Sequence, residues 1–248
     1  MKNAGSRKSP KKTGRGLWLR WVLLAILGLL VLPILQTGCV RWVNPPVTPL
    51  MLLRKAETRL AGKAPAATRY EWRSLEAMPR EFLHFALVAE DQRFFQHSGF
   101  DWKEVRAAQR EAKRTGKPVR GASTISMQCA RSLFLWQGRS WVRKGLEFYY
   151  TFWLETFVPK RRILELYANV AEMGDRVYGV TAASRAHFGV DSRGLTREQC
   201  ARLAALLPAP RKWNPNQPTA RYERRVNRLM RSSAVAIPGW KGLAASSR

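Results

Sequence analysis

The sequence predicts a mainly α-helical protein that begins with a single transmembrane helix. An uncharged apolar run from Trp21 to Val40 predicts the membrane segment, and apolar residues recur at helical spacing in several later segments. No alternating pattern long enough for a useful strand is present. We expect four parts: a basic cytoplasmic tail (1–20), a transmembrane helix (21–40), a juxtamembrane segment and linker (41–69) and one domain (70–240).

The apolar run is long enough to span a bilayer. At about 1.5 Å per residue it covers the hydrocarbon core of about 30 Å. The tail before it is basic and has no acidic residue, so we expect the tail in the cytoplasm and the domain on the outer side of the cytoplasmic membrane. A cleaved signal peptide and a lipoprotein signal at Cys39 are the alternatives. No Ala-x-Ala site ends the run, and Gln36 lies where a lipoprotein signal is apolar.

Helix-breaking residues divide the remaining chain. The prolines of 44–49 give a stiff exit from the membrane, and Pro79 suits the first turn of a helix that ends at Glu90. Later breaks fall at 115–118 and at Pro159. Between the breaks we expect further helices near 50–60, 101–114, from 123 onward, 140–157, 160–169, 181–188 and 196–207.

The chain is strongly basic, with a formal net charge of +27. Seven of the 44 Lys and Arg residues lie in the tail, which leaves +20 on the remainder. Such a charge favours an anionic partner, which can be nucleic acid, anionic lipid or a phosphorylated substrate. An outward-facing domain tethered to a membrane has little access to nucleic acid. We therefore expect phosphate at the membrane surface and no nucleic-acid partner.

A carboxylate at the end of an apolar helix is the first candidate for chemistry. Glu90 follows Phe82, Leu83 and Ala86 at helical spacing, so it shares their face. Burial beside apolar side chains raises a carboxyl pKa toward the range that is useful for proton transfer. The alternative is a helix-terminal acid that reaches solvent. His97, a few residues later, is expected to be a hydrogen-bonded structural residue.

The run 120–128 predicts an anion site. Here a glycine and the hydroxyls of Ser123 and Thr124 open a helix. Free backbone N–H groups and the helix dipole favour an anion at such a position. The alternative is that these hydroxyls only cap the helix.

The run 139–147 places cations around one acid. Arg143, Lys144 and Glu147 fall on one side of a helix because they are three and four residues apart. This set suits a diphosphate, with the cations holding phosphate oxygens and the acid orienting them or holding a divalent ion. A solvated surface ion pair is the alternative.

Together these runs resemble the motifs of glycosyltransferase family 51, the peptidoglycan glycosyltransferases, and most closely its monofunctional biosynthetic type. The resemblance extends over about 41–230, and four motifs in this order and spacing are highly specific. The matching positions are Glu90-Asp91-x-x-Phe94-x-x-His97-x-Gly99, Gly121-x-Ser123-Thr124-Ile125-x-x-Gln128, Arg143-Lys144-x-x-Glu147 and Lys160-x-x-Ile163-Leu164-Glu165-x-Tyr167-x-Asn169.

The resemblance implies a lysozyme-like glycosyltransferase domain whose cleft opens toward the membrane. The implied reaction joins lipid II to a lipid-linked growing glycan chain through β-1,4 bonds, with inversion, and releases undecaprenyl diphosphate. By this resemblance Glu90 is the general base, and Glu147 orients the leaving group or holds a divalent cation such as Mg2+; no other cofactor is implied. Other cell-wall synthases are expected partners. The implied substrate and diphosphate contacts are Ser123, Thr124, Gln128, Arg131, Arg139, Arg143 and Lys144.

Three positions depart from the pattern of the family. Met127 stands where the first of two glutamines is usual, which removes a capping box with Thr124 and one candidate hydrogen bond to substrate. Arg131 replaces a lysine and keeps the charge with a different geometry. Ala168 replaces a leucine at a packing position. Because both acids are present, we expect an active enzyme.

Two alternatives come from other classes of protein. A lysozyme-like hydrolase or lytic transglycosylase would use one acid to protonate a glycosidic oxygen. Cleavage of a finished glycan, however, offers no diphosphate to the cations of 139–147. A non-catalytic membrane-bound scaffold is the second alternative, and it predicts that replacing Glu90 with Gln leaves function unchanged.

Overall fold

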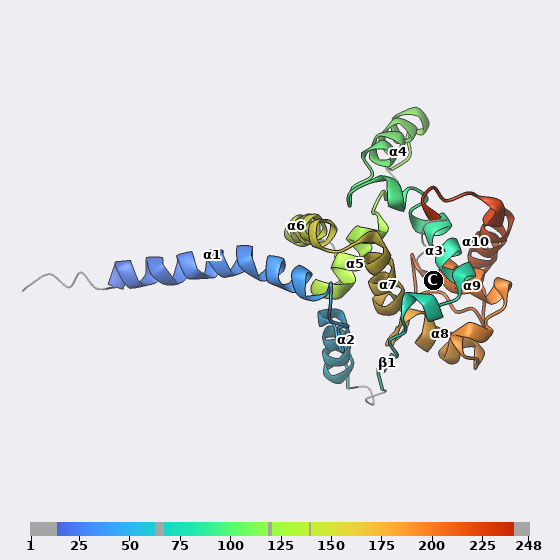
Figure 1. Ribbon diagram of the computed structural model, residues 1–248, viewed down its shortest axis with the longest axis horizontal. Coiled ribbons are helices and arrows are strands. Elements are labelled where there is room, and N and C mark those ends of the chain that lie inside the picture. Colours follow the sequence, from blue (N-terminus) through green and yellow to red (C-terminus); the bar gives the residue numbers. More distant parts are fainter. Residues whose placement is uncertain (1–13, 63–66, 119–120, 139, 241–248) are drawn as a thin grey trace, which may run out of the picture.

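The protein is a mainly helical domain behind one long N-terminal helix (Figure 1). This computed structural model describes residues 14–62, 67–118, 121–138 and 140–240. The α-helices of the described residues are α1 (Gly14–Cys39), α2 (Pro49–Leu60), α3 (Arg80–Glu90), α4 (Trp102–Thr115), α5 (Ile125–Phe134), α6 (Trp141–Phe157), α7 (Lys160–Val170), α8 (Gly179–Phe188), α9 (Arg197–Leu206) and α10 (Ala220–Arg231).

Helix α1 projects from the domain as an apolar rod (Figure 1). Its segment Leu17–Cys39 has 23 residues with a hydropathy of 2.3, so it is long and apolar enough to cross a membrane. The helix begins at Gly14, before the predicted span 21–40. A helix can extend beyond the membrane core because its backbone hydrogen bonds are satisfied internally on either side of that boundary. The C-terminal half of α1 contacts helix α6, where Tyr149 Oη donates to the Leu30 carbonyl at 2.7 Å.

The helices of the domain pack around one hydrophobic core. Helix α3 packs against α9, α5 contacts both α6 and α7, and α10 covers α9. Most of the core consists of aromatic and branched aliphatic residues that are fully buried, which makes hydrophobic burial the main stabilising term. Cys129 and Cys200 belong to this core as buried free thiols, so they form no disulfide.

A small sheet is one of two features that sequence reasoning missed. Strands β1 (Arg69–Tyr70), β2 (Glu172–Gly174) and β3 (Val177–Tyr178) lie in the order β1-β3-β2, with β1 parallel and β2 antiparallel to β3. A strand of two or three residues is too short to show an alternating pattern. The sheet joins the segment before α3 to the turn between α7 and α8.

The structure confirms the predicted helices to within a few residues. Helix α4 spans Trp102–Thr115 where 101–114 was expected, and α6 starts after its cap Ser140. Thr196 caps α9 through a complete capping box. Helix α10 was not predicted, because arginines dominate it and leave a sparse apolar pattern of Tyr222, Val226 and Leu229.

Gly179 offers a test of the packing between α7 and α8. It has a φ of +77°, and a Cβ there would lie 2.4 Å from the Asn169 carbonyl oxygen. Gly189 has a similar φ of +70° but open space around it, so it is a matched control. We expect Gly189→Ala to cost about 1–2 kcal/mol of stability from backbone strain alone. Gly179→Ala should cost roughly 3 kcal/mol or more, because a steric overlap adds to the strain.

Thermal and denaturant unfolding of the detergent-solubilised protein would measure both losses. Equal losses for the two variants would show that the contact with Asn169 does not constrain the turn.

Candidate active site

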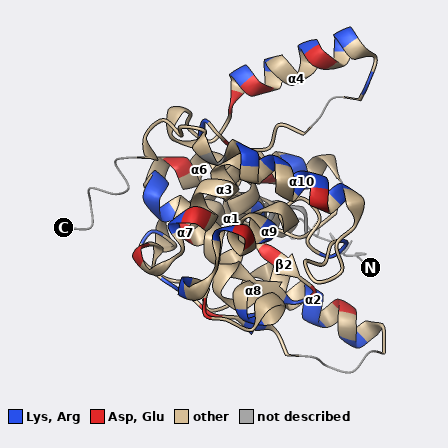
Figure 2. Ribbon diagram, turned by 90° about the vertical axis from the view of Figure 1, so that its right-hand side faces the viewer, with Lys and Arg blue, Asp and Glu red and all other residues tan. Residues whose placement is uncertain are grey.

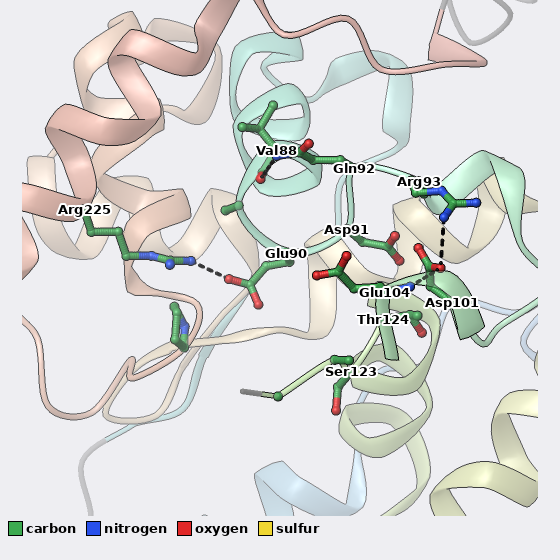
Figure 3. A pocket seen from close by; sticks show the side chains of 14 residues that line it. Val88, Glu90, Asp91, Gln92, Arg93, Asp101, Glu104, Ser123, Thr124 and Arg225 are labelled. Atoms are coloured by element: carbon green, nitrogen blue, oxygen red, sulfur yellow. Dashed lines mark hydrogen bonds and ion pairs between the residues drawn. The ribbon is translucent and has the colours of Figure 1, made fainter. Parts of the chain in front are cut away.

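A cleft of about 530 Å3 lies where the end of α3, the start of α5 and helix α10 meet. Figure 3 shows Glu90 on its wall, with Arg225 on one side and Ser123, Thr124 and Asp101 on the other. Four separate segments of the chain, the end of α3, the start of α4, the start of α5 and helix α10, therefore supply its polar groups. A second, mostly apolar groove of about 510 Å3 shares Ser123 with it and continues between α4 and α6.

Glu90 is the last residue of α3, and its carboxylate is largely buried. Arg225 Nη2 donates to Oε1 at 2.6 Å, and Gln128 Nε2 donates to Oε2 at 3.0 Å. Burial raises the pKa of Glu90 above its usual value, while Arg225, Gln128 and Arg131 oppose the rise. The burial that the sequence predicted for Glu90 is confirmed, and the solvent-exposed alternative is excluded.

The amide of Gln128 is itself held in place. Tyr167 Oη on α7 donates to Gln128 Oε1 at 3.2 Å, so the amide nitrogen is turned toward Glu90. Burial raises the pKa of Tyr167 well above its usual value, so its hydroxyl remains a donor. Glu90 thus accepts from two fixed donors.

Asp91 follows Glu90 directly, but its carboxylate is hydrogen-bonded within the protein. His97 Nε2 lies 3.0 Å from both of its oxygens, and the backbone N–H of Ile125 donates to Oδ2 at 3.0 Å. Thr124 Oγ1 adds a bond to the Gly99 carbonyl at 2.6 Å. The prediction that His97 is a hydrogen-bonded structural residue is confirmed.

The cationic run forms a compact cluster around one buried acid. Arg143 Nη1 lies 2.5 Å and Lys144 Nζ 2.7 Å from the Glu147 carboxylate, whose side chain is 0% exposed. Arg131 Nη1 lies 3.9 Å from the same carboxylate. Its positive charge also lowers the pKa of Glu90 and so opposes the effect of burial. The alternative of a solvated surface ion pair is therefore excluded.

The phosphate-binding candidates lie next to this cluster. Lys144 Nζ is 3.5 Å from Ser123 Oγ, which brings the second and third runs together. Thr124 is engaged within the protein: it caps α5 through Met127 N–H and is 2% exposed, so the capping alternative describes its side chain. The cap persists without the glutamine that Met127 replaces. Arg139 lies outside the described residues.

Sequence reasoning missed one residue of the site, Arg225. It lies on α10, 135 positions after Glu90, and no local signal in the sequence links the two. An apolar pattern at helical spacing, Tyr222, Val226 and Leu229, could have predicted the helix but not its partner.

Two sets of described residues are candidate metal ligands. The ligand atoms of Asp91, His97 and Asp101 lie within 4.8 Å of one another, but these groups already bond to each other, to backbone N–H groups and to Arg93. Glu147 is a single carboxylate surrounded by cations. Mg2+ usually binds one or two carboxylates together with waters and substrate phosphates, and in both sets the carboxylates already have hydrogen-bond or ion-pair partners among the described residues.

The chain is similar to known proteins over most of its length. The family model described as "Transglycosylase" matches residues 57–234. The biosynthetic peptidoglycan transglycosylase of Xanthomonas campestris pv. campestris (strain B100) is 43% identical over 234 residues, which is 94% of each chain. The protein of that name from Rhodospirillum centenum is 42% identical over 217 residues, 88% of this chain and 91% of its own.

The chain belongs to the peptidoglycan transglycosylase family. It is therefore a glycosyltransferase of cell-wall synthesis, with the mainly helical, lysozyme-like domain that the resemblance implied. The apolar helix α1 is consistent with membrane anchoring of this transglycosylase.

The bonds of Asp91 predict a structural role that is separable from chemistry. Asp91→Asn removes charge-assisted hydrogen bonds to His97 and to Ile125 N–H, so we expect a loss of about 2–3 kcal/mol of stability. Asp175, whose side chain is 64% exposed, is the matched control, and Asp175→Asn should change stability little. Chemical denaturation measures both. An unchanged midpoint for Asp91→Asn would show that these bonds do not stabilise the fold.

Proposed function

We propose that this transglycosylase polymerises lipid II into β-1,4 glycan strands and releases undecaprenyl diphosphate, with Glu90 as general base. The observation that supports this most strongly is the pairing of two sites in one region. A buried carboxyl with a raised pKa lines the cleft, and a fixed cluster of cations lies beside it. Proton removal and stabilisation of a leaving diphosphate need these two groups.

In the proposed step Glu90 takes the proton from the 4-hydroxyl of the acceptor's GlcNAc. The freed oxygen attacks the anomeric carbon of the donor's MurNAc and forms the new C–O bond. The bond between that carbon and the phosphate oxygen breaks, and its electron pair leaves with the diphosphate. Attack from the opposite face converts the α-linkage into a β-1,4 bond.

Lys144, Arg143 and Arg131 are proposed to stabilise the charge that develops on the leaving diphosphate. Ser123 Oγ, beside Lys144, adds a donor, and Arg139 is a further proposed contact. Cations that are already fixed need no reorganisation when this charge develops, which is the main source of electrostatic catalysis. We propose that Glu147 keeps Arg143 and Lys144 in place and is not itself a metal ligand, because the two cations occupy its oxygens.

Arg225 is proposed to set the protonation of the base. Burial favours the neutral acid, which cannot accept a proton, and the ion pair with Arg225 favours the carboxylate. The balance gives a base whose pKa is above that of an exposed glutamate. In the cell, we propose that α1 crosses the inner membrane once and leaves the domain in the periplasm.

Polymerisation of labelled lipid II by the full-length protein in detergent tests this function. We expect polymer from the wild type and a loss of at least about a hundredfold in rate for Glu90→Gln, since a general base contributes 10²–10⁴-fold. Glu81→Gln, a change of the same type on the first turn of α3, is the control and should remain active. Equal activity of Glu90→Gln and the wild type would exclude the proposed base and favour a non-catalytic scaffold.

The pH dependence tests Arg225. The rate should fall as the pH drops through the pKa of Glu90, because the protonated carboxyl accepts no proton. Arg225→Gln removes a cation that stabilises the carboxylate. The acidic limb of the pH–rate profile, where the rate falls, should therefore move to higher pH. Arg225→Lys keeps the charge and should shift the limb less. A limb at the same pH in all three proteins would show that Arg225 does not tune the base.

A further inference from the structure

One face of α10 carries a row of arginines with no acid opposite it. Arg221, Arg224, Arg228 and Arg231 follow one another at steps of three, four and three residues, so they share one face of the helix, and all four are exposed. We call these four residues the arginine row. None of their side chains makes an ion pair or hydrogen bond with a residue that the structure describes, and all 17 acidic residues of the chain are among those described.

The packing of α10 does not require this row. Its opposite face, with Tyr222, Val226 and Leu229, is buried, and Tyr222 Oη donates to the Arg202 carbonyl of α9 at 2.7 Å. Glu223, the acid of this helix, is paired with Arg202 at 2.7 Å. Like charges at these spacings repel one another. The row is therefore an uncompensated positive surface that an external anion would stabilise.

The position of the row excludes contact with the bilayer that α1 would cross. Helix α10 lies at the end of the domain opposite α1 (Figure 1), and arginines line it on the face seen in Figure 2. The row also adjoins the cleft. Arg225, one turn after Arg221 and one turn before Arg228, lines the cleft and donates to Glu90 at 2.6 Å. A polymer that leaves the cleft away from the membrane therefore passes the row.

We propose that the arginine row binds the acidic stem peptides of the growing glycan strand, an inference that rests on the proposed function. The row extends over roughly 15 Å at about 1.5 Å per residue, which suits an extended polymer better than a single anion. Guanidinium groups bind carboxylates in a bidentate manner, and the stem peptides repeat carboxylates along the strand. Several weak contacts of this kind hold the strand between successive additions.

The test compares strand lengths in neutral detergent at moderate salt. The row variant is R221Q/R224Q/R228Q/R231Q, since Gln keeps helix propensity while it removes the charge. The matched control, K103Q/R106Q/R110Q/R114Q, removes the same charge from exposed positions of α4. Each protein polymerises lipid II with free stem-peptide carboxylates and, separately, lipid II with those carboxylates amidated.

With acidic lipid II, the row variant should start polymerisation at the wild-type rate but make strands about fivefold shorter, because four screened contacts together change affinity by roughly tenfold. The control should match the wild type, and amidated lipid II should remove the difference. Equal strand lengths, shortening that persists with amidated lipid II, or shortening only after anionic lipid is added would each overturn the proposal.

Failure of the proposed function gives a different result. A folded wild-type protein that forms no polymer contradicts the polymerase proposal whatever the row does. The row is then tested by retention on immobilised poly-L-glutamate, from which the wild type should elute at higher NaCl than the row variant. Elution of both at the same NaCl concentration would overturn the row as a carboxylate-binding surface.

Discussion

The carboxylate of Asp91 joins the end of α3 to the start of α5, and the geometry of the cleft follows from that bond. It accepts from His97 Nε2, which closes the turn after α3, and from Ile125 N–H, the first backbone donor of α5. With Asp91 held in the interior, Glu90 remains on the wall of the cleft. A second network joins the start of α5 to α6 and α7: Glu155 on α6 accepts from Lys160 on α7 at 2.7 Å and from Ser126 on α5.

The two acids of the site differ in what surrounds them. Glu90 has one close cation and an amide, and burial raises its pKa. Glu147 is fully buried and has three arginine or lysine groups within 4 Å, so its charge is compensated and those cations are fixed. Removing one partner of a buried ion pair lowers the stability of the fold by more than the intact pair contributes to it. Two carboxylates with distinct environments can thus have distinct tasks, one in proton transfer and one in positioning.

Local sequence signals predicted most of the fold, and spatial contacts account for what they missed. Prolines, caps such as Ser140 and Thr196, and apolar spacing located the helices because these signals act within one turn. The clustering of Arg143, Lys144 and Glu147 was predictable for the same reason. The contact between Arg225 and Glu90 was not, since it depends on how α10 packs. Thr124 could be read as a cap or an anion site, and its bonds to Met127 N–H and to the Gly99 carbonyl show that its side chain is engaged within the protein.

The contact between α6 and α1 determines the depth of the site in a membrane. Tyr149 bonds to Leu30, which lies nine residues before the outer end of α1, or roughly 13 Å along the helix axis. If α1 crosses a bilayer as proposed, this contact brings α6, with its exposed Trp141 and Phe152, against the membrane. Under the proposed function, a domain held against the membrane in this way can act on a lipid-linked substrate that stays in the bilayer, so its substrate search is confined to two dimensions.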